Sequence, residues 1–220
     1  MPRKPVAWAG PVLAFVLLTA LAQWSSQSLG GWVFVRTEFG AGAWWQLLSA
    51  QWVHLGLAHA AVNVGAMALI AFIFSAWVPR SAQYMAWLGG FAGVAMVLAA
   101  DAQCVYYAGA SGALHGYWAG AALVLGFWRS GDVLSRPTTG YFGGLLLLCL
   151  ALKLGLQPAL QRGAGGASPL AIMGGVTNGA IHLPVYYPAH AAGAAGGAVM
   201  VLLWMLWMSL RLSASRQRPA

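Results

Sequence analysis

The chain has few charged residues, and acidic residues are the scarcest of them: aspartate and glutamate together occur three times in 220 residues. Charged residues of both signs make up 6% of the chain, whereas a soluble domain carries about 25%. A chain with so little charge cannot cover a folded globule with polar surface, which excludes a soluble protein. The hydrophobic share of 60% and the mean hydropathy of +0.72 indicate a helical protein that crosses a membrane several times.

Cysteine is also rare, and the distribution of basic residues excludes another class of partner. Cys104 and Cys149 form neither a disulfide framework nor a metal-binding spacing. We therefore expect no metal and no organic cofactor. The net charge of +8 comes from lysines and arginines that are scattered singly through loops and tails. Such a distribution is typical of residues that set membrane topology and does not form a phosphate-binding face, so we expect a lipid bilayer and no nucleic acid as surroundings.

Six apolar segments each approach the roughly 20 residues that a transmembrane helix requires. We expect a single membrane domain over residues 1–220, an all-α bundle with six spans at about 6–24, 53–78, 82–100, 111–128, 140–156 and 188–210. The first segment follows Arg3-Lys4 and also fits a signal peptide. We interpret it as a retained span, because the apolar run is long and no small-residue cleavage site precedes Trp24.

The basic residues predict the orientation of these spans. With six spans both termini lie on one side, which then holds eight of the 11 lysines and arginines: Arg3, Lys4, Arg80, Arg129, Arg136, Arg211, Arg216 and Arg218. The other side holds Arg36, Lys153 and Arg162. The positive-inside rule therefore predicts that both termini are cytoplasmic. The same topology places the polar residues of the second, fourth and sixth spans at the outer ends of their helices.

The stretch from Gly109 to Gly116, with the sequence Gly-Ala-Ser-Gly-Ala-Leu-His-Gly, places Ser111 at the start of the fourth span. A serine is tolerated in a membrane helix without any function, because its hydroxyl bonds back to the preceding turn. Other polar groups make a function more plausible here. His54, His59 and Asn63 precede the stretch and His190 follows it, each near the end of another apolar segment. We expect these groups to meet in one pocket, with Ser111 as a nucleophile.

Small residues recur every four positions on the fourth and sixth spans. Gly112, Gly116 and Gly120 form one row, and Ala189, Gly193 and Gly197 form the other. Rows of this spacing lie on one helix face and let two backbones approach closely, which also occurs in proteins without any catalysis. If the two rows pack together, Ser111 comes close to His190, which precedes Gly193 by three residues. A serine hydroxyl needs such a base, because it is protonated at neutral pH.

A carboxylate usually orients the histidine of a serine triad. This chain has only Glu38, Asp101 and Asp132, and none of them lies in a predicted span. We therefore predict a Ser111–His190 dyad, with the imidazole oriented by packing. His115 lies one turn after Ser111 on the same face, where it either stacks on His190, hydrogen-bonds to it or only packs helices.

His59 and Asn63 are four residues apart on the second span, and both side chains can donate hydrogen bonds. Acyl transfer requires donors where negative charge develops on the substrate oxygen. The side chains of His59 and Asn63 and the backbone N–H of Ser111 are the candidate donors, although an interhelical hydrogen bond also explains the pair. His54 lies further out. We expect it to brace the long loop between the first and second spans, residues 25–52, or to be only structural.

Three patterns together resemble the rhomboid intramembrane serine proteases: His54-x4-His59-x3-Asn63, Gly109-x-Ser111-Gly112 and Ala189-His190-x2-Gly193-x3-Gly197. The resemblance covers spans two to six and implies Ser111 as nucleophile, His190 as base, and an oxyanion site at His59 and Asn63. The sequence around Ser111 and the small size are most similar to the rhombosortase branch. That branch implies a bacterial inner membrane, an active site open to the periplasm, and single-span substrates with a C-terminal Gly-Gly sorting tail.

The sequence departs from the family in two places and leaves two other functions open. Trp45-Gln46 stands where many rhomboids have Trp-Arg, and His115 stands where many have tyrosine. One alternative function is metal binding by His54, His59, His115 and His190. The other is a transporter or an inactive rhomboid-like protein that binds membrane helices.

Overall fold

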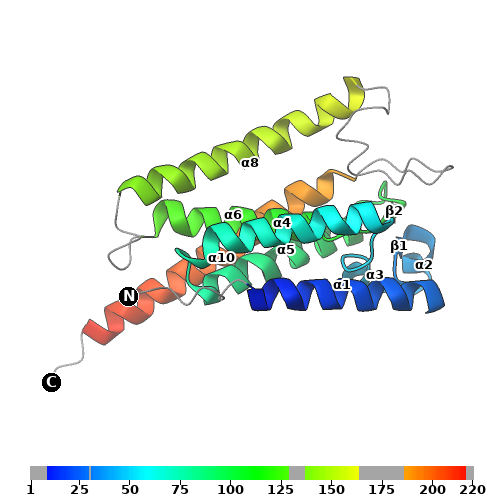
Figure 1. The fold of residues 1–220 in the computed structure, drawn as a ribbon, viewed down its shortest axis with the longest axis horizontal. Helices are drawn as coiled ribbons and strands as arrows, with labels where there is room; N and C mark the ends of the chain where they lie inside the picture. Colours follow the sequence, from blue (N-terminus) through cyan, green and yellow to red (C-terminus); the bar gives the residue numbers. More distant parts are fainter. Residues whose placement is uncertain (1–8, 30, 129–136, 164–185, 217–220) are drawn as a thin grey trace.

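The computed structural model describes residues 9–29, 31–128, 137–163 and 186–216, and these residues are mostly helical (Figure 1). The helices are α1 (Ala9–Leu29), α2 (Arg36–Gly40), α3 (Gln46–Ser49), α4 (Leu57–Ser75), α5 (Arg80–Ala100), α6 (Ser111–Phe127), α8 (Pro137–Gly163) and α10 (Pro188–Arg216). Two strands, β1 (Phe34–Val35) and β2 (Tyr106–Tyr107), pair antiparallel.

Four of the described helices are long and apolar enough to cross a membrane. They are α4, α5, the Pro137–Ala159 part of α8 and the Pro188–Ala214 part of α10. Helix α6 has 17 residues, and the apolar part of α1 is shorter than a full span. The prediction of a helical membrane protein is therefore confirmed at the level of its class.

Several helices begin or end a few residues away from the predicted span boundaries. Helix α4 begins at Leu57, whereas the second span was predicted from about residue 53, so His54 lies in the loop before α4. The fifth was expected to end at residue 156, but α8 continues through Pro158 to Gly163. Hydropathy finds apolar runs, whereas a helix continues wherever its hydrogen bonds do, even through polar residues at its end. The extension of α8 matters because it brings Gln157 onto the same helix as Lys153.

Helix α6 is the centre of the bundle, and most of its residues are buried. Figure 1 shows α4, α5 and α10 around it and α8 leaning away along one side. Glycines bring α5 into this packing as well: a side-chain carbon on Gly90 would collide with the backbone of Ala113, and one on Gly93 with the carbonyl of Ala192. The small-residue rows of α6 and α10 were predicted from the sequence, whereas these glycines of α5 were not.

One end of the bundle carries β1, β2, α2 and α3 (Figure 1). The pairing of Phe34 with Tyr107 joins the segment between α1 and α4 to the loop before α6, which the all-α prediction did not anticipate. Gln46 is fully buried there, accepts a hydrogen bond from the Val35 N–H at 3.0 Å and donates to Glu38. This amide therefore braces the segment between α1 and α4.

Arg36 supplies the positive charge in the same region. Its guanidinium donates to the backbone carbonyls of Leu98, Asp101 and Cys104, where α5 ends. It also lies 4.8 Å from the ring centroid of Phe34. A charged donor at the carbonyl end of a helix stabilises carbonyls that have no partner within that helix. Arg36 thus ties the first loop to the end of α5, next to the start of α6.

Candidate active site

Ser111 and His190 are hydrogen-bonded, with 2.8 Å between the serine Oγ and the histidine Nε2. Ser111 is the first residue of α6 and is partly exposed, whereas His190 is 5% exposed in the first turn of α10. A contact of this length is within the range for a serine hydroxyl and its base. The predicted proximity of these two side chains is confirmed.

The small-residue rows bring the two helices together as the sequence predicts. A side-chain carbon on Gly193 would collide with the carbonyl group of Gly112, and one on Gly197 with the carbonyl group of Gly116. A carbon on Gly120 would lie 2.8 Å from the carbonyl oxygen of Gly197. The absence of side chains along this line lets α6 and α10 pack backbone to backbone. The Ser111–His190 contact depends on that approach.

The turn that leads into Ser111 also requires glycine. Gly109 has φ +124°, a conformation that other residues rarely adopt. Its N–H donates to the Ala50 carbonyl at 2.8 Å, and its carbonyl accepts from the Tyr107 hydroxyl at 2.8 Å. Burial raises the pKa of Tyr107, so this hydroxyl remains a donor at neutral pH. These bonds hold the residues before Ser111 in one position.

His190 is oriented by an amide as well as by packing. Its Nδ1 lies 3.0 Å from Oε1 of Gln157, near the C-terminal end of α8. In the described part of the chain no carboxylate contacts His190, since Glu38 pairs with Gln46 and Asp101 accepts from Tyr186. Gln157 was not predicted as a site residue, because the fifth apolar segment was expected to end at residue 156. A polar residue one helical turn after Lys153 was the available signal.

His115 stacks on His190, with 4.3 Å between ring centroids and 12° between ring planes. Its Nδ1 lies 2.6 Å from the Ser111 carbonyl oxygen, and its Nε2 is hydrogen-bonded to the Lys153 ammonium. The sequence left three roles open for His115, and the structure shows the first of them, stacking on His190. Lys153, predicted only as a topology-setting residue, is part of the site.

His59 and Asn63 lie on α4 beside the turn at Gly109. A side-chain carbon on Gly109 would lie 2.9 Å from His59 Nε2, so the ring rests against this glycine, two residues before Ser111. His59 Nδ1 accepts from the Leu55 N–H at 3.4 Å, which leaves the ring proton on Nε2. Asn63 is buried and donates from Nδ2 to the His59 carbonyl at 3.0 Å. His59 therefore presents a donor close to Ser111, while Asn63 supports the same helix turn.

His54 contacts the Ser111 loop. Its ring Nε2 accepts from the Ala110 N–H at 3.5 Å, and its backbone N–H donates to Oε1 of Gln23 on α1 at 2.8 Å. Burial and the neighbouring His59 ring lower the pKa of His54 to about 4, and the two ring centroids are 5.0 Å apart. A neutral His54 thus braces the residue before Ser111.

Tyr186, two residues before α10, hydrogen-bonds to the Asp101 carboxylate. This bond holds the pKa of Asp101 below its usual value. The ring of Tyr186 also meets the ring of Tyr107 edge to face, 6.4 Å between centroids. The chain is therefore anchored on both sides of the site, before α6 and before α10.

The four histidines of the site are also the candidate ligands of the metal-binding alternative. Among residues 9–29, 31–128, 137–163 and 186–216, no three histidine, cysteine or acidic side chains form a group that could hold an ion. Asp132 and His182 lie outside the described residues. The four histidines of the metal alternative instead contact carbonyl, amide, hydroxyl and amine groups.

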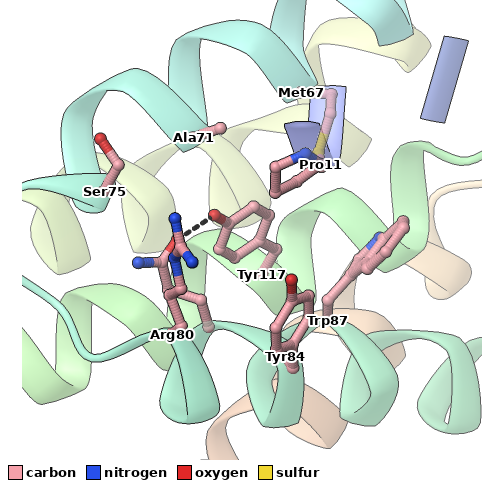
Figure 2. A pocket seen from close by; sticks show the side chains of 9 residues that line it. Pro11, Met67, Ala71, Ser75, Arg80, Tyr84, Trp87 and Tyr117 are labelled. Atoms are coloured by element: carbon pink, nitrogen blue, oxygen red, sulfur yellow. Dashed lines mark hydrogen bonds between the residues drawn. The ribbon is translucent and has the colours of Figure 1, made fainter. Parts of the chain in front are cut away.

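A small cavity of about 20 Å³ lies elsewhere in the bundle, among α1, α4, α5 and α6. Figure 2 shows Arg80, Tyr84 and Tyr117 around it. It adjoins Ser75, at the C-terminal end of α4, whereas His59 and the serine lie at the opposite end of that helix. The cavity is therefore separate from the Ser111 site.

No protein-family model matches the chain, and neither a curated protein nor a solved structure matches it. The fold and the site define a helical membrane protein with a hydrogen-bonded serine and histidine at one end of its central helices.

Proposed function

We propose that the protein is an intramembrane serine endopeptidase of the rhomboid type. The observation that carries this proposal is the 2.8 Å contact between the Ser111 hydroxyl and His190 Nε2 at the first turns of two closely packed helices. In water a serine hydroxyl is a poor nucleophile, and an adjacent base is what activates it. The stacked His115 and the Gln157 amide keep the base in a fixed orientation.

The proposed reaction proceeds through an acyl-enzyme. Ser111 Oγ attacks the peptide carbonyl carbon while His190 Nε2 takes the hydroxyl proton, and His190 then returns that proton to the leaving amine. Water then attacks the resulting ester while His190 Nε2 takes its proton, and His190 returns that proton to Ser111 Oγ as the acid product leaves. The Nε2–H of His59 and the N–H of Ser111, which begins α6 and so precedes the intrahelical hydrogen bonds, are the proposed oxyanion donors. Asn63 supports His59 through its carbonyl.

We further propose the topology and the substrate class that the sequence resemblance implies. In this proposal six helices span a bacterial inner membrane, both termini are cytoplasmic and the site opens to the periplasm. The substrate is a single-span protein with a C-terminal Gly-Gly sorting tail, as for rhombosortases. Glycine near the scissile bond fits the chemistry, because a helix opens most readily where glycine weakens it by about 1 kcal/mol relative to alanine.

Substrate processing in membranes tests this proposal. The full chain is co-expressed with a tail-anchored protein that carries a Gly-Gly tail, and cleavage is followed by blotting and mass spectrometry. Ser111→Ala and His190→Ala are expected to abolish cleavage, and a fluorophosphonate probe is expected to label the wild type but not Ser111→Ala. As a matched control, Ser209→Ala removes a hydroxyl that bonds to its own helix and should leave both readouts unchanged. Equal cleavage by wild type and Ser111→Ala would overturn the proposal.

A further inference from the structure

Two polar side chains on α8 reach the two stacked histidines from the same helix face. Lys153 and Gln157 are four residues apart, so they lie one above the other on α8. The Lys153 ammonium bonds to His115 Nε2, and Gln157 Oε1 lies 3.0 Å from His190 Nδ1. Nearby residues of α8, such as Leu152 and Leu156, are more than half exposed. Each histidine therefore receives one dedicated partner from α8.

The partners of His115 permit only one arrangement of its proton. A carbonyl oxygen accepts and cannot donate, so the 2.6 Å contact with the Ser111 carbonyl requires a proton on His115 Nδ1. An ammonium donates and cannot accept, so the Lys153 contact requires a lone pair on His115 Nε2. His115 is then neutral, with its proton on Nδ1.

The same reasoning applies to His190. To accept the Ser111 hydroxyl proton, His190 Nε2 must carry a lone pair, which places the ring proton of the neutral form on Nδ1. Gln157 Oε1 accepts that proton at 3.0 Å. If the amide were reversed, its NH2 would donate to Nδ1, and the proton would move to Nε2, where it would prevent base catalysis.

We propose that Lys153 and Gln157 are positioning residues that fix both stacked imidazoles as Nδ1–H tautomers. This inference rests on the proposed function and adds to it the roles of two side chains of α8. When Ser111 transfers its proton to His190 Nε2, the imidazolium keeps its Nδ1–H bond to Gln157, so no bond of the base is broken. His115 remains neutral beneath it, because the Lys153 ammonium occupies the lone pair that a second proton would need.

Nitrogen NMR tests the tautomers without any need for catalysis. Full-length protein labelled with 15N-histidine is studied in detergent micelles, and signals of the five histidines are assigned with His115→Gln and His190→Gln. Both rings are expected as Nδ1–H tautomers in the wild type. Gln157→Leu should give His190 mixed tautomers. In Lys153→Met the Ser111 carbonyl still holds the proton on His115 Nδ1, and the freed Nε2 should take a second proton at a higher pH than in the wild type. A wild-type spectrum with the His190 proton on Nε2 overturns the inference, as does a His190 tautomer unchanged in Gln157→Leu.

Substrate turnover provides a second readout with matched variants. Gln157→Leu is expected to lower kcat about 100-fold with KM changed by less than about twofold, the size of a lost contribution to base catalysis. Gln157→Glu and Lys153→Arg retain an acceptor and a donor and should restore most of the activity. Leu156→Met, an exposed residue of the same helix, serves as the control. Full activity of Gln157→Leu overturns the positioning role. If no variant or wild type cleaves any substrate while the tautomers are as expected, only the protease proposal fails.

Discussion

Gly193 of α10 packs directly against the carbonyl group of Gly112 of α6, with no space for a side chain between the two backbones. The atoms that a new side chain would meet are backbone atoms, which cannot rotate away. The distance between these helices is therefore fixed by the lack of a side chain, and the serine and histidine at the helix starts depend on that distance.

Gly193→Ala is expected to push α10 from α6 and to abolish cleavage while the bundle still forms. Overpacking of this kind costs about 1–3 kcal/mol, and a shift of about 1 Å at the site is enough to lower the rate 100-fold. Thermal unfolding in detergent and substrate cleavage measure the two effects. Gly144→Ala is the matched control, because nothing lies within 4 Å of its added carbon. Equal activity of Gly193→Ala and wild type would show that the packing of these glycines does not set the site.

Gly109→Ala is expected to abolish activity for two reasons that a control separates. The residue has φ +124°, and a side-chain carbon would lie 2.7 Å from Cε1 of His59. Gly42→Ala introduces comparable strain, at φ +106°, with nothing within 4 Å of the new carbon. We expect Gly42→Ala to lose only stability, about 1–2 kcal/mol, and to keep its kcat. Loss of kcat in both variants would assign the effect to backbone strain and not to the His59 contact.

The stability of the protein is expected to fall as the pH is lowered from 6.5 to about 4. The unfolded chain protonates His54 near pH 6.5, whereas the folded chain does so only near pH 4. The unfolded state therefore binds more protons in this window, and the free energy of unfolding decreases as the pH falls. At about 1.4 kcal/mol per pH unit, the full loss is about 3 kcal/mol.

His54→Gln removes the titrating group and keeps a side-chain acceptor for the Ala110 N–H. Thermal unfolding in detergent between pH 7.5 and 4 is expected to show a smaller loss of stability for this variant than for wild type. His59 is the neighbouring titratable ring, so a His59→Gln variant is measured in parallel. The same acid dependence in His54→Gln and wild type would contradict the role given to burial of His54.

The sequence alone was sufficient for the class of protein and for the pairing of Ser111 with His190. Apolar runs near 20 residues predict membrane helices, because the bilayer requires that length and internal hydrogen bonding. Small residues four apart predict a close helix contact, because they lie on one face. Both signals are local in the chain, so they can be read without coordinates. The rows containing Gly112 and Gly193 therefore predicted a contact between residues 79 positions apart.

Only the tertiary structure identified the two groups of α8 that contact the stacked histidines. The Gln157 and Lys153 contacts depend on how far α8 continues and which way its face turns, and neither follows from hydropathy. The pairing of β1 with β2 and the Arg36 contacts join segments more than 60 residues apart through a few hydrogen bonds. Such contacts leave no periodic pattern in the sequence. The physical reason is that periodicity reports which face of a helix is buried. The partner of one polar side chain instead depends on which other segment the fold places beside it.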